Sequence, residues 1–134
     1  MVDKNEILFP YEEIRKVQDN LIEMIFHSLP DKQNLIVHAP TGLGKTSASI
    51  CPSIAYALEN DMKVLFLTSR HTQHHLAVET LKDIKKKHDV KIISSDLIGK
   101  KWMCSQAGAK GLYSNEFSEF CKKMREDKTC EYYN

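Results

Sequence analysis

The chain has 134 residues, a formal net charge of +1 and 42% apolar residues, a composition typical of one globular domain. The near-neutral charge gives no general argument for nucleic-acid binding, so any such site has to be local. No apolar run reaches the ~20 residues that span a bilayer, and the charged N-terminus lacks the apolar segment of a signal peptide. We therefore expect no membrane association and an intracellular location, cytoplasmic or, in a eukaryote, nuclear.

The first element expected is an amphipathic helix from Tyr11 to about Ser28. Apolar side chains recur there at steps of three and four residues, at Ile14, Val17, Leu21, Ile22, Ile25 and Leu29. Gln18 on this helix carries an amide that donates and accepts together, which suits the N6/N7 edge of adenine. The alternative is that Gln18 is an ordinary solvated residue of the helix surface.

A glycine-rich segment follows the next apolar run, 34–38, which we expect to be a buried strand. It reads Ala39-Pro40-Thr41-Gly42-Leu43-Gly44-Lys45-Thr46 and leads into a helix from Thr46 to about Asn60. Glycines let the backbone curl and aim its N–H groups at phosphate oxygens, and the helix N-terminus adds positive potential. Lys45 supplies a charge for the β- and γ-phosphates and Thr46 a hydroxyl for Mg²⁺. The sequence predicts a nucleoside triphosphate site; the alternative is a glycine-rich turn that binds nothing.

Two further apolar runs complete an alternating pattern. We expect strands over 63–68 and 90–94, separated by a helix from Thr72 to about His88 with Leu76, Leu81 and Ile84 facing inward. Strands that are apolar almost throughout, alternating with helices, predict an α/β fold with a parallel sheet covered on both faces. Cys51, beside Ile50 on the second helix, is expected to be a small buried apolar residue.

Polar residues follow the second expected strand, at 68–73. The carboxyl edge of an open parallel sheet is where ligands bind, and hydroxyls with an arginine suit a nucleic-acid phosphate. Ordinary capping of the helix by Ser69 or Thr72 is the alternative, and the two roles are compatible.

The pattern changes after about residue 99. Charged, aromatic and cysteine residues are interspersed, and the segment contains Cys104, Cys121 and Cys130. Three thiols in a short segment with little core suggest a soft metal, zinc or iron–sulfur. Their spacing lacks the tight C-x-x-C pairs of zinc ribbons, so three unpaired thiols are the alternative.

Together these features resemble the XPD family of iron–sulfur superfamily-2 DNA helicases, to which DinG is related. The residues that carry the resemblance are Phe9-Pro10-Tyr11, Arg15, Gln18, the segment from Ala39 to Thr46, Leu67-Thr68-Ser69-Arg70, Thr72-Gln73, and Gly99-Lys100-Lys101 ahead of Cys104. The resemblance implies a RecA-like P-loop ATPase core with a parallel sheet, present as part of the first motor domain over residues 1–99. It also implies an incomplete iron–sulfur unit over residues 100–134.

The roles that the resemblance implies fall into three groups. Tyr11, Arg15 and Gln18 would serve the adenine, and the run Ala39, Pro40, Thr41, Gly42, Leu43, Gly44, Lys45, Thr46 and Ser47 would hold ATP and Mg²⁺, with Lys45 and Thr46 catalytic. Single-stranded DNA would contact Ser69, Arg70, Thr72, Lys100 and Lys101. A [4Fe–4S] cluster would take Cys104, Cys121 and Cys130, with its fourth ligand outside this chain.

The expected function is that of an ATP-dependent DNA helicase that unwinds in the 5′-to-3′ direction, in DNA repair. The Asp-Glu-Ala-His box and the second motor domain that such an enzyme needs are absent, so we expect an N-terminal fragment with negligible ATP hydrolysis of its own. Two alternatives stay open: another P-loop ATPase or nucleotide transferase, and a non-catalytic, metal-containing module that binds nucleic acid.

Overall fold

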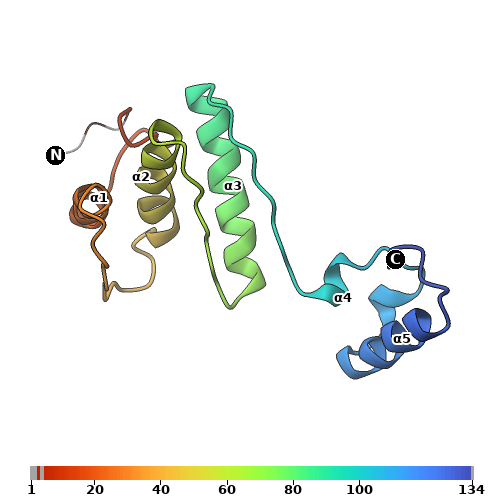
Figure 1. Cartoon of the computed structure of the whole chain (residues 1–134). Coiled ribbons are helices and arrows are strands. Elements are labelled where there is room, and N and C mark those ends of the chain that lie inside the picture. The colour runs from red at the N-terminus through yellow and green to blue at the C-terminus, as the bar shows by residue number, and fades with distance from the viewer. Residues whose placement is uncertain (1–2, 4, 134) are drawn as a thin grey trace. The chain divides into compact units, whose positions relative to one another are not determined.

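The computed structural model describes residue 3 and residues 5–133, and its regular elements are helices joined by looped and extended segments (Figure 1). They are α1 (Lys16–Ser28), α2 (Lys45–Glu59), α3 (His71–His88), α4 (Lys100–Met103), the 3-10 turn η1 (Ala109–Gly111) and α5 (Ser114–Glu126). The chain divides into two compact units, one up to Ser94 and the other from Ser95. A search of the described helices for one long and apolar enough to cross a membrane finds none.

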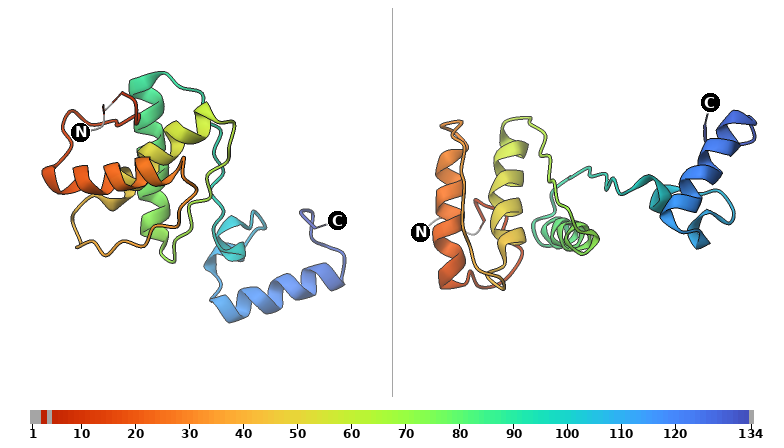
Figure 2. Two further views of the ribbon diagram at one scale, coloured as in Figure 1. Left: turned by 60° about the vertical axis from the view of Figure 1, so that its left-hand side comes forward. Right: turned by 90° about the horizontal axis from the view of Figure 1, so that it is seen from below.

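The first unit is built on three helices, with α2 packed against both α1 and α3 (Figures 1 and 2). Its core lies where these helices meet and also takes in the N-terminal segment and Ile92. The buried side chains are Ile7, Phe9, Leu21, Ile22, Ala48, Ile50, Cys51, Ala77, Ile84 and Ile92. Pro52 is also fully buried, and α2 runs through it.

The helices α2 and α3 lie where the sequence predicts them, whereas α1 begins at Lys16 rather than at the predicted Tyr11. The apolar faces predicted for α1 and α3 are too wide. Val17 on α1 is 62% exposed, and Leu76 on α3 is 54% exposed. Each of them is next in sequence to a buried residue of its helix. Val17 is followed by Gln18, which is buried on α1 together with Leu21, and Leu76 is followed by Ala77, which is buried on α3. A helix that packs against neighbours on one side buries a stripe rather than a broad face, so these two side chains lie at its margin.

The prediction of a parallel sheet is wrong: the described residues form no strand. The segments 34–38, 63–68 and 90–94 are extended but unpaired, and no backbone hydrogen bond joins any two of them. A strand is held by the N–H and C=O groups of a neighbour about 4.8 Å away, and these segments have no such neighbour in the described part of the chain.

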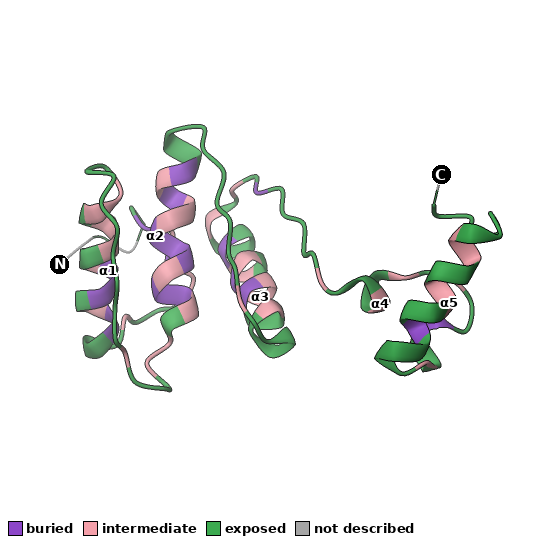
Figure 3. Cartoon of the chain, turned by 60° about the horizontal axis from the view of Figure 1, so that its bottom comes forward, coloured by how far each residue is buried: buried purple, intermediate pink, exposed green. Residues whose placement is uncertain are grey.

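Their side chains nevertheless alternate in exposed fraction, although most of these residues are exposed and green in Figure 3. Ile36 is 98% exposed while its neighbours Leu35 and Val37 are 41% and 39% exposed. Ile93 is 88% exposed beside Ile92 at 7%. An extended chain directs successive side chains to opposite sides, and the helices of this unit cover one side. The coverage on both faces that the apolar runs predict is therefore not present.

The second unit has a small interior. Ala109 and Phe117 are its buried apolar side chains, and Phe120, Cys121 and Met124 are half-buried along α5. Residue Arg125 of α5 donates from Nε to the carbonyl of Cys121 (3.3 Å), and its guanidinium lies over the Tyr133 ring, 5.1 Å from the centroid. These polar and cation–π contacts help to hold the segment after α5 where the apolar core is slight.

Candidate nucleotide-binding site

The glycine-rich loop leads directly into the N-terminus of α2. Gly42 and Gly44 have φ of 82° and 85°, a left-handed conformation that residues with a Cβ rarely adopt. Gly44 is the cap residue, and its carbonyl accepts the first helical hydrogen bond from the N–H of Ala48 (3.1 Å). The N–H groups of the first turn that follow it have no partner within the helix, which is the arrangement that binds anions.

Two side chains at the start of α1 donate hydrogen bonds to carbonyl groups of this loop. Gln18 donates from Nε2 to the carbonyl of Gly44 (3.2 Å), and Arg15 donates from Nη1 to the carbonyl of Gly42 (3.2 Å). The other end of the Gln18 amide accepts from the backbone N–H of Arg15 (3.1 Å). Gln18 is 5% exposed, so its amide is committed to the backbone on both sides. Of the residues predicted to serve adenine, Arg15 and Gln18 contact this loop, whereas the printed contacts of Tyr11 are to Phe9 and Lys87. Contact of any of them with a base stays a prediction.

These two hydrogen bonds also orient the peptide groups of the loop. In a trans peptide the N–H points opposite to the C=O of the preceding residue. Holding the carbonyls of Gly42 and Gly44 toward α1 therefore turns the N–H groups of Leu43 and Lys45 the other way. The loop offers donors on the side away from α1, which is the polarity that a phosphate requires.

Lys45 lies across the same loop. Its Nζ donates to the carbonyls of Ala39 (3.1 Å) and Pro40 (2.7 Å), and the side chain is exposed. Two carbonyl oxygens are weaker partners for an ammonium group than phosphate oxygens, because charge-assisted bonds to an anion are stronger. The lysine can therefore exchange these partners for a bound phosphate at little cost. Thr46 beside it is half-buried, and Ser47 is buried at 8% exposure.

The N-terminal segment before α1 is tied to the far end of α3. His88 donates from Nε2 to the carbonyl of Phe9 (3.1 Å), and Lys87 donates from Nζ to the carbonyl of Tyr11 (3.1 Å). The Phe9 ring is fully buried and meets Tyr11 edge to face, with 5.6 Å between centroids. The sequence patterns do not predict this anchor, and the one signal for it in the sequence is the basic run at the end of α3. Through it, α3 supports the segment that carries Arg15 and Gln18.

Residues 15–110 match the family model for the DEAD/DEAH box helicase, which covers more than half of the chain. The chain belongs to the DEAD/DEAH box helicase family. It is 35% identical over 103 residues to a protein of Methanocaldococcus jannaschii described as a "Probable ATP-dependent helicase". That match covers 76% of this chain and 15% of the relative, so the chain spans a small part of the relative's length. No solved structure matches the chain.

The residues predicted to contact DNA in this helicase-family chain lie at two places. Ser69, Arg70 and Thr72 stand at the start of α3, where Arg70 is the cap residue and no side chain caps the helix. The hydroxyl of Thr68 instead donates to the side-chain oxygen of Gln73. The predicted capping by Ser69 or Thr72 is therefore not seen, and both side chains are exposed. Contact with a nucleic acid stays a prediction.

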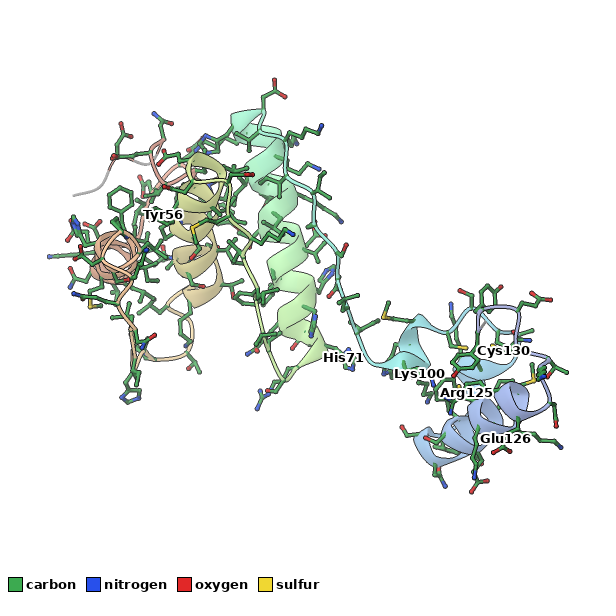
Figure 4. All side chains as sticks on the ribbon, in the orientation of Figure 1. Tyr56, His71, Lys100, Arg125, Glu126 and Cys130 are labelled. Atoms are coloured by element: carbon green, nitrogen blue, oxygen red, sulfur yellow. The ribbon has the colours of Figure 1, made fainter. Side chains whose placement is uncertain are left out.

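The second place is α4, in the other compact unit, where Lys100 is exposed and Lys101 half-buried. The Nζ of Lys101 lies 5.2 Å from the centroid of the Trp102 ring, so this lysine pairs with an aromatic neighbour. Figure 4 labels Lys100 on this unit together with Arg125, Glu126 and Cys130.

The predicted metal ligands do not fit a metal as they stand. Cys104, Cys121 and Cys130 are half-buried free thiols, and among the described residues no group of three or more His, Cys, Asp or Glu side chains could hold a metal ion. The residues present therefore do not form a cluster site. The remaining cysteine, Cys51, is fully buried as predicted, and burial raises the pKa of its thiol to about 12.

Proposed function

We propose that this chain is the nucleotide-binding part of an ATP-dependent helicase. The proposal is carried by one observation: the two glycine carbonyls of the loop are held by Gln18 and Arg15, while Lys45 and the first turn of α2 present donors. In this assignment the run from Ala39 to Ser47 holds the triphosphate. Membership in the helicase family supports ATP as the nucleotide.

Within that assignment, Lys45 exchanges its two loop carbonyls for phosphate oxygens, and Thr46 would hold Mg²⁺. The bound metal ion would neutralise charge on the phosphates. Tyr11 and Arg15 remain the candidates for contact with the adenine, and Gln18 would support that end of the nucleotide through the loop backbone. The loop itself moves no proton, so hydrolysis requires a group that positions water.

We further propose the XPD type, with 5′-to-3′ movement on single-stranded DNA and a role in DNA repair. The support is the sequence pattern that joins Gln18, the loop beginning at Ala39 and Lys100-Lys101 ahead of Cys104. An iron–sulfur cluster is not proposed for this chain, because Cys104, Cys121 and Cys130 make no metal site in the described part of the chain. Ser69, Arg70, Thr72, Lys100 and Lys101 are the proposed contacts to the strand.

The nucleotide proposal is tested by equilibrium binding of a fluorescent ATP analogue to the chain with Mg²⁺. We expect binding that Lys45→Ala weakens by at least about tenfold, because a charge-assisted contact contributes about 1.5–3 kcal/mol. Lys63→Ala is the matched control, since it removes an exposed lysine that lies outside the loop. Equal affinity of the Lys45→Ala and Lys63→Ala variants would contradict the proposal.

Polarity and substrate are tested on the full-length gene product with duplexes that carry a single-stranded extension at either end. The XPD-type proposal expects ATP-dependent strand separation with a 5′ extension of DNA and little with a 3′ extension. Preference for the 3′ extension, or for RNA, would leave the helicase family assignment in place and refute the subtype. Turnover by the present chain is expected to equal that of its Lys45→Ala variant.

A further inference from the structure

A cavity of about 420 Å³ lies within the second compact unit and is lined by residues of the segment 102–111. Its volume falls in the range of about 300–1,000 Å³ that small-ligand sites occupy. Trp102 forms part of the wall and is 56% exposed, although an indole is among the side chains most favoured by burial. An aromatic ring left this open beside a cavity is suited to stacking with a planar ligand.

A polar group of the same cavity has an unmet hydrogen bond. Gln106 lines it, and the side-chain oxygen of Gln106 is buried with no hydrogen-bond partner in the described part of the chain. A buried acceptor left unpaired costs about 1–3 kcal/mol. A ligand with an N–H edge would satisfy it, as the Watson–Crick edges of nucleobases do.

The segment that lines the cavity carries charge of one sign. The sequence from 97 to 113 contains three lysines, Lys100, Lys101 and Lys110, and no acidic residue. Lys110 itself lines the cavity, and both it and Lys100 are exposed. A planar base with a phosphate on each side matches an indole, an amide acceptor and flanking ammonium groups.

The cavity is not the site of the predicted metal. Cys104 lines it, but Cys121 and Cys130 do not. Its walls contain no carboxylate or histidine either, so beside the Met103 thioether it offers a single thiolate to a metal that needs four ligands.

We propose that this cavity binds one unstacked base of a single-stranded nucleic acid, with the base stacked on Trp102 and hydrogen-bonded to Gln106. The inference rests on the proposed nucleic-acid function and names the residues that hold the strand in this unit. Lys100 and Lys110 hold the neighbouring phosphates, while Lys101 keeps its place over one face of the Trp102 ring. Stacking and backbone charge do not depend on the sequence of the strand, so the site accepts mixed sequences.

Trp102 is the only tryptophan of the chain, so its fluorescence reports on this cavity alone. The test uses a mixed-sequence single-stranded oligonucleotide and a second oligonucleotide of equal length with abasic residues. We expect the first to quench Trp102 on binding and the second to bind without quenching it. Equal quenching by both would overturn the proposal, because phosphate contact alone would then account for the signal.

Affinity is measured separately with the oligonucleotides carrying a fluorescent label. Trp102→Leu is expected to weaken binding of the normal oligonucleotide by about 5- to 150-fold, the effect of removing one base–aromatic stack, and to leave the abasic one unchanged. Trp102→Phe keeps a stacking ring and is expected to retain most of the affinity. Tyr113→Leu is the matched control, because Tyr113 is 76% exposed and lies outside the cavity.

The outcomes separate this inference from the proposed function. If the chain binds the ATP analogue and the oligonucleotide but Trp102→Leu binds as tightly as Tyr113→Leu, the base site is refuted and the helicase proposal stands. If no oligonucleotide binds while ATP does, the base site and the proposed nucleic-acid contacts fail together. Circular dichroism of each variant confirms that its helices are retained.

Discussion

The side-chain amide of Gln18 donates to the backbone carbonyl of Gly44 across 26 residues of sequence, at 3.2 Å. This hydrogen bond joins α1 to the cap of α2 and fixes the last peptide of the phosphate loop. A Cβ added to Gly44 would lie 2.2 Å from the Gln18 nitrogen, so the contact also requires glycine at this position. The first helix is therefore part of the proposed nucleotide site through the backbone of the loop.

Gly44→Ala is expected to destabilise the chain more than Gly42→Ala. Both glycines have positive φ, and a Cβ in that conformation costs about 1–2 kcal/mol. At Gly42 the added Cβ meets nothing within 4 Å, whereas at Gly44 it displaces the Gln18 amide. Loss of those hydrogen bonds adds about 1 kcal/mol. Urea unfolding of the two variants measures the difference, and equal free energies of unfolding would show that Gln18 adjusts without loss.

Gln18→Ala is expected to weaken binding of ATP and GTP by the same factor. Both ends of the amide bond the backbone, at Gly44 and Arg15, so its loss loosens the loop without changing the contact to the base. Titration of both nucleotides against the unmodified chain and the variant gives the two ratios. A much greater loss for ATP than for GTP would instead support direct reading of adenine by Gln18.

Cys51 is expected to make stability fall with pH in the alkaline range. Burial raises the pKa of its thiol to about 12, so above the ordinary thiol pKa of about 8.5 the unfolded chain loses a proton that the folded chain keeps. The free energy of unfolding then falls by about 1.4 kcal/mol per pH unit from this group until pH reaches the folded pKa. Urea unfolding against pH should give a shallower slope for Cys51→Ala, and equal slopes would contradict the assignment.

Thiol labelling provides an independent check of the same burial. Under native conditions we expect Cys104, Cys121 and Cys130 to react with a thiol reagent in a fast phase, because all three are half-buried. Cys51 is expected to react only as the chain unfolds, since its thiol is buried and protonated. Fast labelling of all four thiols in folded protein would refute this.

The anchor between α3 and the N-terminal segment is expected to contribute to stability. Lys87→Ala removes a hydrogen bond to the Tyr11 carbonyl and should cost about 0.5–1 kcal/mol. Lys86→Ala is matched in helix position and charge, so its smaller effect isolates the hydrogen bond. His88→Ala should cost at least as much as Lys87→Ala, because the His88–Phe9 bond is partly buried. Equal denaturant midpoints for the Lys87→Ala, Lys86→Ala and His88→Ala variants would show that the anchor does not contribute to the free energy of unfolding.

Local sequence determined the helices and the loop between them. Apolar spacing predicted α1 and α3, and the glycine-rich segment with Gly42, Gly44 and Lys45 predicted the phosphate loop and the start of α2, because periodicity and φ > 0 depend on neighbours in the chain. The burial of Cys51 followed from its place on α2. The same reasoning failed for the sheet. The apolar runs at 34–38, 63–68 and 90–94 indicate a preference for burial, but a strand also needs a neighbouring strand to bond with, and an apolar run does not specify one.

Tertiary structure decided which partners those residues find. Gln18 holds Gly44, Arg15 holds Gly42, and His88 holds Phe9 across 79 residues, contacts that no local pattern specifies. It also placed Trp102 and Gln106 around one cavity while leaving Cys121 and Cys130 outside it. Residue type set the chemistry that each side chain can perform. The packing of helices far apart in the sequence set the geometry, because a hydrogen bond requires its donor and acceptor to meet within about 3 Å.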